Sequence, residues 1–231
     1  MSDKNINIKL GKLTLQGIIN IPKGAKFLII FAHGSGSSRK SPRNNFVAKV
    51  FQKNNFATLL FDLLTEEEDK IYENRFDIDL ITGRLIEATE WLSKNPETSA
   101  LGIEYFGAST GSAAAIKAAV ALQGKINPVR GQGASGKAQK NQTSNGVKAV
   151  VSRGGRVDLA GDVAEELNVP ILLIIGGNDK DVVELNEKFY KKIKSRKKIE
   201  IIPGATHLFE EPGALEKVAN IAAGWFSEHL K

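Results

Sequence analysis

The sequence predicts a single α/β domain built on a doubly wound, mostly parallel β-sheet. From about residue 26 onward, short apolar runs rich in β-branched and aromatic residues alternate with segments in which apolar residues recur every three or four positions. Several of these runs are continuously apolar, which is typical of strands buried on both faces of a sheet. The chain has 231 residues, a length that one α/β unit commonly reaches, so we expect one domain over residues 1–231.

Strands are expected where the short apolar runs lie, and helices where the spacing of apolar residues is helical. The predicted strands are at 13–21, 27–32, 57–61, 101–106, 147–151, 171–175 and 199–202. The predicted helices are at 78–92, in the Ala-rich stretch 112–122, at 182–193 and at 212–229. The final helix closes the domain.

Residues 124–146 interrupt this alternation with a polar, Gly-rich segment. It holds four positive charges and no acidic residue, in a chain whose net charge is +6. We interpret it as an insertion loop at the amino-terminal edge of the sheet, away from the carboxyl ends of the parallel strands. Its Gly131-Gln-Gly133-Ala-Ser-Gly136 matches a dinucleotide-binding pattern, but no strand delivers these glycines to a helix. A polar loop is therefore favoured, with nucleotide binding as the alternative.

Composition disfavours several classes of protein. The chain has no cysteine, which excludes disulfides, thiolate metal sites and a cysteine nucleophile. Its longest apolar runs are far shorter than the roughly 20 residues of a membrane span, and the first residues lack the apolar block of a secretory signal. A basic run at 191–198 follows a predicted helix, where a solvated helix end is favoured over a nucleic-acid site. We therefore expect a cytoplasmic protein that acts on a small molecule and binds neither nucleic acid nor membranes, with the oligomeric state open.

The pentapeptide Gly107-Ala-Ser109-Thr-Gly111 matches the pattern G-x-S-x-G. It follows the predicted strand at 101–106 and opens the predicted helix at 112–122, and this strand–turn–helix context presents a serine on a strained turn. Glycine is needed on both sides because the strand and helix backbones approach too closely for side chains. We therefore expect Ser109 to be a nucleophile at the carboxyl edge of the sheet.

A serine hydroxyl needs a general base, and the chain has three histidines. His207 follows the predicted strand at 199–202 and so lies at the carboxyl edge, which makes it the expected base. His33 ends another strand in a Gly-rich turn and is interpreted as a structural residue of that turn. His229 lies near the end of the last helix and is interpreted as an exposed side chain.

The base in turn needs an acid that orients it. Asp179 follows the strand at 171–175 and is the expected acid. Asp181 is the alternative, but it comes where the next helix begins and has an ordinary role there as a cap or dipole partner. The resulting chain order Ser109, Asp179, His207 is the order found in nucleophile-elbow hydrolases.

Two backbone N–H groups are expected to form an oxyanion hole. The residue after the nucleophile, Thr110, supplies one. Ser35, in the Gly-rich turn at 33–36, is placed to supply the other.

Four stretches together resemble the α/β-hydrolase superfamily, specifically the small dienelactone-hydrolase-like proteins. They are Phe31-Ala-His-Gly-Ser-Gly-Ser-Ser38, Phe106-Gly-Ala-Ser-Thr-Gly111, Gly176-Gly-Asn-Asp179 and Pro203-Gly-Ala-Thr-His-Leu-Phe-Glu-Glu-Pro212. The resemblance covers the chain apart from 124–146. It implies a serine hydrolase that needs no metal or organic cofactor and uses Ser109, Asp179 and His207 as its triad. The chain departs from dienelactone hydrolases proper, which carry a cysteine nucleophile, and this puts their lactone substrate in doubt.

The expected substrate is a small ester or related acyl compound. Only residues 153–169 separate two predicted strands where larger relatives insert a cap, so we expect no large cap domain and an open pocket. Arg153 and Arg156 follow a strand at the same edge and are candidates to bind a carboxylate or phosphate of the substrate, the alternative being an ion pair with Asp158 or Asp162. Acyl transfer by the same triad, and a noncatalytic binding or regulatory role, remain alternatives to hydrolysis.

Overall fold

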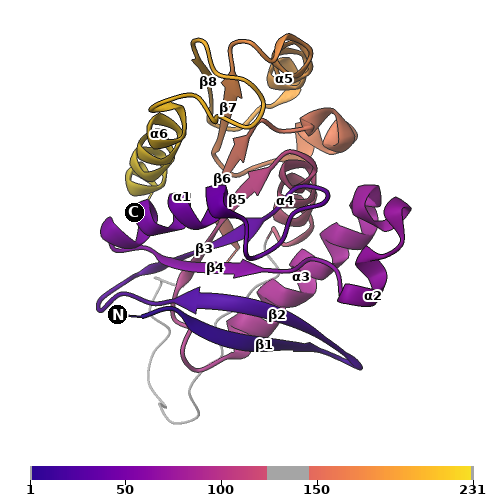
Figure 1. Cartoon of the computed structure of the whole chain (residues 1–231), viewed down its shortest axis with the longest axis vertical. Helices are drawn as coiled ribbons and strands as arrows, with labels where there is room; N and C mark the ends of the chain where they lie inside the picture. The colour runs from indigo at the N-terminus through magenta and orange to yellow at the C-terminus, as the bar shows by residue number, and fades with distance from the viewer. Residues whose placement is uncertain (1, 124–145, 230–231) are drawn as a thin grey trace, which may run out of the picture.

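Residues 2–123 and 146–229 are described in a computed structural model, where they form an eight-stranded sheet with helices on both faces (Figure 1). The strand order is β1-β2-β4-β3-β5-β6-β7-β8. β2 is antiparallel to both of its neighbours, and the other pairs are parallel. The strands are β1 (Lys4–Leu10), β2 (Leu13–Asn20), β3 (Phe27–Ala32), β4 (Ala57–Phe61), β5 (Gly102–Ala108), β6 (Val147–Arg153), β7 (Ile171–Gly176) and β8 (Lys197–Ile202). The predicted doubly wound, mostly parallel sheet is confirmed.

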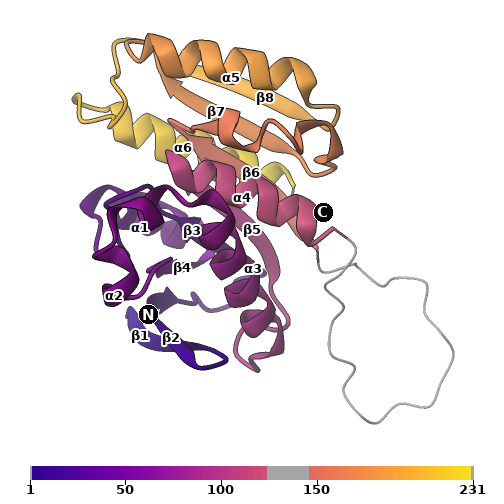
Figure 2. The same ribbon diagram turned by 90° about the vertical axis from the view of Figure 1, so that its right-hand side faces the viewer.

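Two groups of helices cover the two faces of the sheet (Figure 2). One face carries α3 (Ile78–Lys94), α4 (Thr110–Ala121) and α5 (Lys180–Lys192), and the other carries α1 (Pro42–Lys53) and α6 (Ala214–Glu228). The shorter elements are α2 (Glu66–Asp69) and the 3₁₀ turns η1 (Tyr72–Phe76), η2 (Val157–Ala160) and η3 (Ala164–Glu166). None of the helices formed by the described residues is long and apolar enough to cross a lipid bilayer.

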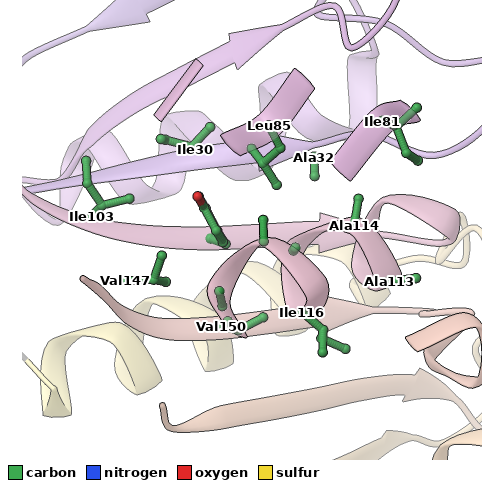
Figure 3. Close-up of a cluster of buried hydrophobic side chains, with 14 of the residues drawn as sticks. Ile30, Ala32, Ile81, Leu85, Ile103, Ala113, Ala114, Ile116, Val147 and Val150 are labelled. Carbon is green, nitrogen blue, oxygen red and sulfur yellow. The ribbon is translucent and has the colours of Figure 1, made fainter. Parts of the chain in front are cut away.

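Each face buries its own apolar core. On the first face, Figure 3 shows side chains of β3, β5 and β6 among side chains of α3 and α4, including Ile30, Ile103, Val150, Leu85 and Ile116. On the second face the core is largely aromatic. The ring centroids of Phe31 and Phe106 are 5.0 Å apart, and those of Phe51 and Phe226 are 5.6 Å apart. These two cores hold the central strands rigidly beneath the loops at their carboxyl ends.

Besides α2 and the 3₁₀ turns, the structure adds one strand and one longer helix that the sequence analysis missed. β1 pairs with β2 at the edge of the sheet, and only Ile8 of its seven residues is buried, so its apolar signal is weak. α1 begins at Pro42 with Ser41 as its cap, the Ser41 hydroxyl accepting the Asn44 N–H at 3.3 Å. β6 also extends two residues beyond its predicted end, to Arg153.

The connections decide what lies near the carboxyl edge of the sheet. Residues 154–170, which join β6 to β7, form the turns η2 and η3 rather than a cap domain. Apart from Gly146, the predicted insertion loop at 124–146 lies outside the described residues. α4 begins and β6 ends at the carboxyl edge of the sheet. The last turn of α4 and the first residues of β6 therefore lie at the opposite edge.

One acidic side chain lies inside the sheet. Glu104 of β5 pairs in register with Ile29 and is 0% exposed, and within the described residues neither of its carboxyl oxygens has a hydrogen-bond partner. Burial without a partner disfavours the charged form, so the pKa of Glu104 is raised well above its ordinary value. Burial therefore favours the neutral acid over the carboxylate.

Stability should depend on pH through this residue. Because the pKa of Glu104 is higher in the folded protein than in the unfolded chain, its stabilising contribution is complete below about pH 4.5 and is lost as the pH rises toward the folded-state pKa, by up to about 1.4 kcal/mol per pH unit. Urea unfolding between pH 5 and 8 should give a steeper loss of unfolding free energy for wild type than for Glu104→Gln. If the unfolding free energies of the two proteins changed equally with pH, the Glu104 carboxyl group would be accessible to water.

Candidate active site

Ser109 lies on a sharp turn between β5, which ends at Ala108, and α4, which begins at Thr110. Its backbone has φ 51° and ψ −123°, a strained conformation for a residue with a side chain. A Cβ at Gly107 would lie 2.5 Å from the Ser112 Cα, so glycine is required for this turn to form. The Ser109 N–H donates to the Arg153 carbonyl at 3.1 Å, which ties the turn to β6.

His207 lies between Ser109 and Asp179. Its Nε2 is 3.3 Å from the Ser109 Oγ, and its Nδ1 is 2.6 Å from the Asp179 Oδ2. A carboxylate only accepts hydrogen bonds, so the Nδ1–H donates to Asp179, and Nε2 is free to accept the Ser109 hydroxyl proton. The Ser–His separation is slightly longer than an ideal hydrogen bond, and such catalytic contacts tighten when substrate binds. The structure thus brings together the three predicted residues.

Two loops hold His207 and Asp179 in place. Asp179 occupies the cap position of α5, but its side chain makes no capping bond and points to His207 instead. In the His207 loop, the Glu211 carboxylate accepts the Thr206 N–H at 3.0 Å and the Thr206 hydroxyl at 2.6 Å. The next buried residue, Phe209, has a positive φ of 56°, a second strained position at this edge.

The two residues predicted for the oxyanion hole, Ser35 and Thr110, are in contact. Thr110 is the first residue of α4, where backbone N–H groups have no partner within the helix. The Ser35 N–H donates to the Thr110 hydroxyl at 2.9 Å, so this donor already has an acceptor within the chain. Its role in an oxyanion hole therefore stays a prediction.

Both ring nitrogens of His33 bond to the backbone. Nδ1–H donates to the Gly34 carbonyl at 2.9 Å, and Nε2 accepts the Leu63 N–H at 3.1 Å. Burial lowers the pKa of His33, against the raising effect of the Gly34 carbonyl, Asp62 and Asp69. His33 thus links the segments after β3 and β4 as a neutral imidazole. His229, at the end of α6, is half-buried rather than exposed as expected: its ring centroid lies 4.5 Å from that of Trp225, and Nδ1 bonds to the Trp225 carbonyl at 2.7 Å.

Replacing His33 should therefore affect stability. His33→Phe keeps a ring but leaves the Leu63 N–H unpaired, and we expect the free energy of unfolding to fall by about 1–3 kcal/mol. Because the folded-state pKa is lowered, the contribution of His33 is complete above its unfolded value of 6.5 and is lost as the pH falls below it. Denaturant unfolding at pH 5 and 8 should accordingly show a smaller difference between the two proteins at pH 5. A constant difference would contradict the buried, neutral imidazole.

A cavity of about 220 Å³ opens beside Ser109 and His207. Arg43 of α1 and Arg153 of β6 line it, together with serines of the 34–41 segment. A separate cavity of about 210 Å³ lies between the 37–40 and 62–69 segments and includes neither Ser109 nor His207. The cavity beside Ser109 is therefore the candidate active site.

The two predicted substrate-binding arginines differ in their surroundings. Arg156 forms a bidentate pair with Asp158, the alternative expected from the sequence, with both N···O distances at 2.9 Å, and it does not line the cavity beside Ser109. Arg153 is only 8% exposed and lines the cavity, and burial together with the nearby Arg43 lowers its pKa to about 10. Sequence reasoning missed Arg43. The signal that could have found it is the helix start Ser41-Pro42, which places the next side chain near the sheet edge.

Within residues 2–123 and 146–229, no group of three or more His, Asp or Glu side chains is arranged to hold a metal ion. By their chemistry, Ser109 can serve as a nucleophile, His207 as a base and Asp179 as an acid, beside the guanidinium groups of Arg43 and Arg153 that line the cavity.

Comparison with known proteins gives relatives over the full chain, although no protein-family model matches. The chain is 45% identical to a Mycobacterium tuberculosis protein that is named, provisionally, as a phosphoribosyl transferase. The match covers 100% of this chain but 47% of that protein, so the chain spans about half the length of its curated relatives.

Solved structures give a relative of matching length. A dienelactone hydrolase from Anabaena variabilis is 44% identical, with a TM-score of 0.87 and coverage of 100% of this chain and 99% of that one. Est1E from Butyrivibrio proteoclasticus has a TM-score of 0.77 at 16% identity, covering 98% of each chain, and shows that the fold is shared. By its sequence and its fold, the chain belongs to the dienelactone hydrolase family of α/β-hydrolases.

Proposed function

We propose that the protein is a serine hydrolase that cleaves esters of small acids through an acyl-enzyme. The observation that carries this proposal is the continuous chain of polar contacts from the Ser109 Oγ through His207 to Asp179. The dienelactone hydrolase relative supports hydrolysis as the reaction class. The cavity of about 220 Å³ favours a small substrate.

The first half of the proposed reaction acylates Ser109. His207 Nε2 takes the hydroxyl proton as Oγ forms a bond to the carbonyl carbon of the ester. Asp179 keeps the Nδ1–H directed at itself and stabilises the imidazolium that forms. The negative charge on the carbonyl oxygen is met by the Thr110 N–H, joined by the Ser35 N–H when it exchanges the Thr110 hydroxyl for the oxyanion. The imidazolium then protonates the leaving alcohol as the carbon–oxygen bond breaks.

The second half releases the acid. A water molecule gives a proton to His207 while its oxygen attacks the acyl carbon, and the returning proton restores the Ser109 hydroxyl. An acceptor alcohol in place of water would make the same machinery an acyltransferase. Analysis of the products formed with added methanol separates the two reactions.

The name of the mycobacterial relative refers to phosphoribosyl transfer, which is a different reaction. That protein is about twice as long as the part matched here, and its name describes the whole of it. A serine nucleophile with a histidine base also suits acyl transfer, because an acyl-serine splits ester cleavage into two easier steps.

The proposal can be tested directly. A fluorophosphonate should form one covalent adduct, located by mass spectrometry on the peptide that contains Ser109. A panel of 4-nitrophenyl esters of increasing acyl length should show turnover that declines for long chains, since the cavity is small. Labelling at another residue would overturn the assignment of Ser109 as the nucleophile. A folded protein with no turnover across the panel would overturn the proposal in favour of a noncatalytic role.

A further inference from the structure

Arg153 lies immediately beside the proposed nucleophile. It is the last residue of β6 and pairs in register with Ala108, the residue before Ser109. Its carbonyl accepts the Ser109 N–H, so the backbones of the two residues are joined directly. Its side chain lines the same cavity as Ser109 and His207. Anything bound at Ser109 therefore comes close to this guanidinium group.

Arg153 differs from the other arginines of the described residues because it has no acidic partner. Arg153 Nε and Nη1 are buried and make no hydrogen bond with any described residue. This leaves Nη2 as the nitrogen that can reach the cavity. The other six described arginines each form an ion pair with an aspartate or a glutamate: Arg39, Arg43, Arg75, Arg84, Arg156 and Arg196.

The residues that line the cavity beside Ser109 give it a positive electrostatic potential. They include two arginines, Arg43 and Arg153, and no acidic residue. Two acids that contact lining residues are engaged by them: Glu210 pairs with Arg43 at 2.6 Å, and Asp179 bonds to His207. The hydroxyl-bearing residues Ser37 and Ser41 also line the cavity, which adds neutral donors beside the two cations.

A buried guanidinium without a counter-charge is unfavourable, because burial removes water and no carboxylate replaces it. A bound anion restores the missing partner, because the Nη2 group can donate a charge-assisted hydrogen bond to an oxygen of a carboxylate or phosphate. We propose that Arg153 binds an anionic group of the substrate, so that the natural substrate is a small ester with a carboxylate or phosphate near its scissile carbonyl. This inference rests on the proposed function and adds the substrate class.

Binding can be measured without catalysis. In Ser109→Ala protein, which keeps the cavity but lacks the nucleophile, we expect glutarate or inorganic phosphate to bind in calorimetric titrations, while neutral glutaramide does not. Adding Arg153→Met should raise the Kd of the bound anion at least 30-fold, and Arg153→Lys should recover part of that loss. Arg156→Met is the matched control: it removes an arginine of the same segment that already has a partner, and should leave the Kd within about twofold. Failure of both anions to bind, or an unchanged Kd in folded Arg153→Met, would overturn the inference.

Kinetics test the same point in the intact enzyme. We expect kcat/KM to be higher for 4-nitrophenyl hydrogen glutarate, or for the matching 3-phosphonopropionate ester, than for the butyrate ester. The better anion identifies carboxylate or phosphate as the recognised group. The ratio of anionic to neutral kcat/KM should fall at least 30-fold in Arg153→Met and stay unchanged in Arg156→Met. An equal fall for both ester types would make Arg153 a general structural residue and overturn the inference. If no ester is turned over, the proposed function fails, and the binding experiment still decides the role of Arg153.

Discussion

Replacing Ser109 with alanine should reduce kcat for activated short esters by roughly 10⁶-fold, because the remaining groups of the site cannot supply a nucleophile. The fluorophosphonate adduct should disappear in parallel. The free energy of unfolding should change little, since serine and alanine both carry a Cβ and meet the same strain at φ 51°. Stopped-flow assays of the ester, with urea unfolding of the same samples, check both expectations.

Ser112→Ala is a matched control for this experiment. Ser112 is a fully buried serine in the first turn of α4 whose hydroxyl has no partner among the described residues. It does not line the cavity that contains Ser109, so its loss should leave the adduct in place. Ser109→Gly adds a further contrast, because glycine relieves the positive-φ strain and should raise stability by about 1–2 kcal/mol while activity is lost. Wild-type turnover in Ser109→Ala would exclude the covalent mechanism.

The sequence predicts the centre of this fold well because the signals there are local. Strands such as β4 and β7 are buried throughout and almost entirely apolar, since both faces of the sheet are covered, and they stand out from any helical pattern. The turn around Ser109 is also encoded locally: the glycines at 107 and 111 and the preceding apolar run act within a few residues of each other. Chain order then places residues that follow parallel strands at one edge.

Other features depend on contacts between distant segments and could not be predicted in the same way. Whether an arginine has a partner is decided by the fold: Arg156 finds Asp158 two residues away, whereas Arg153 meets Arg43 from a helix far off in the chain. Likewise, the bond between the Ser35 N–H and the Thr110 hydroxyl joins residues 75 positions apart. Glu104 is the clearest departure from local rules, an acidic residue within a buried strand.

The two aspartates at the start of α5 allow the proposed acid to be tested against a near neighbour. The Asp179 carboxylate lies 2.6 Å from His207 Nδ1. Asp181 lies in the first turn of α5, one position after Lys180, and is exposed. A carboxylate there interacts favourably with the amino-terminal end of the helix dipole, which is worth less than about 1 kcal/mol at an exposed site. The two residues therefore have the same chemistry in different surroundings.

Asp179→Asn should lower kcat by up to about 10⁴-fold, because the amide no longer fixes the tautomer of His207 or stabilises its protonated form. Asp181→Asn should change kcat less than tenfold, since it removes only the weak interaction with the helix end. Both variants can be assayed with one short ester at one pH, and thermal unfolding of each establishes that the fold is retained. If Asp181→Asn were the inactive enzyme and Asp179→Asn the active one, the assignment of the acid would be reversed. If both stayed active, His207 would be oriented by its loop alone, through the Thr206–Glu211 contacts beside it.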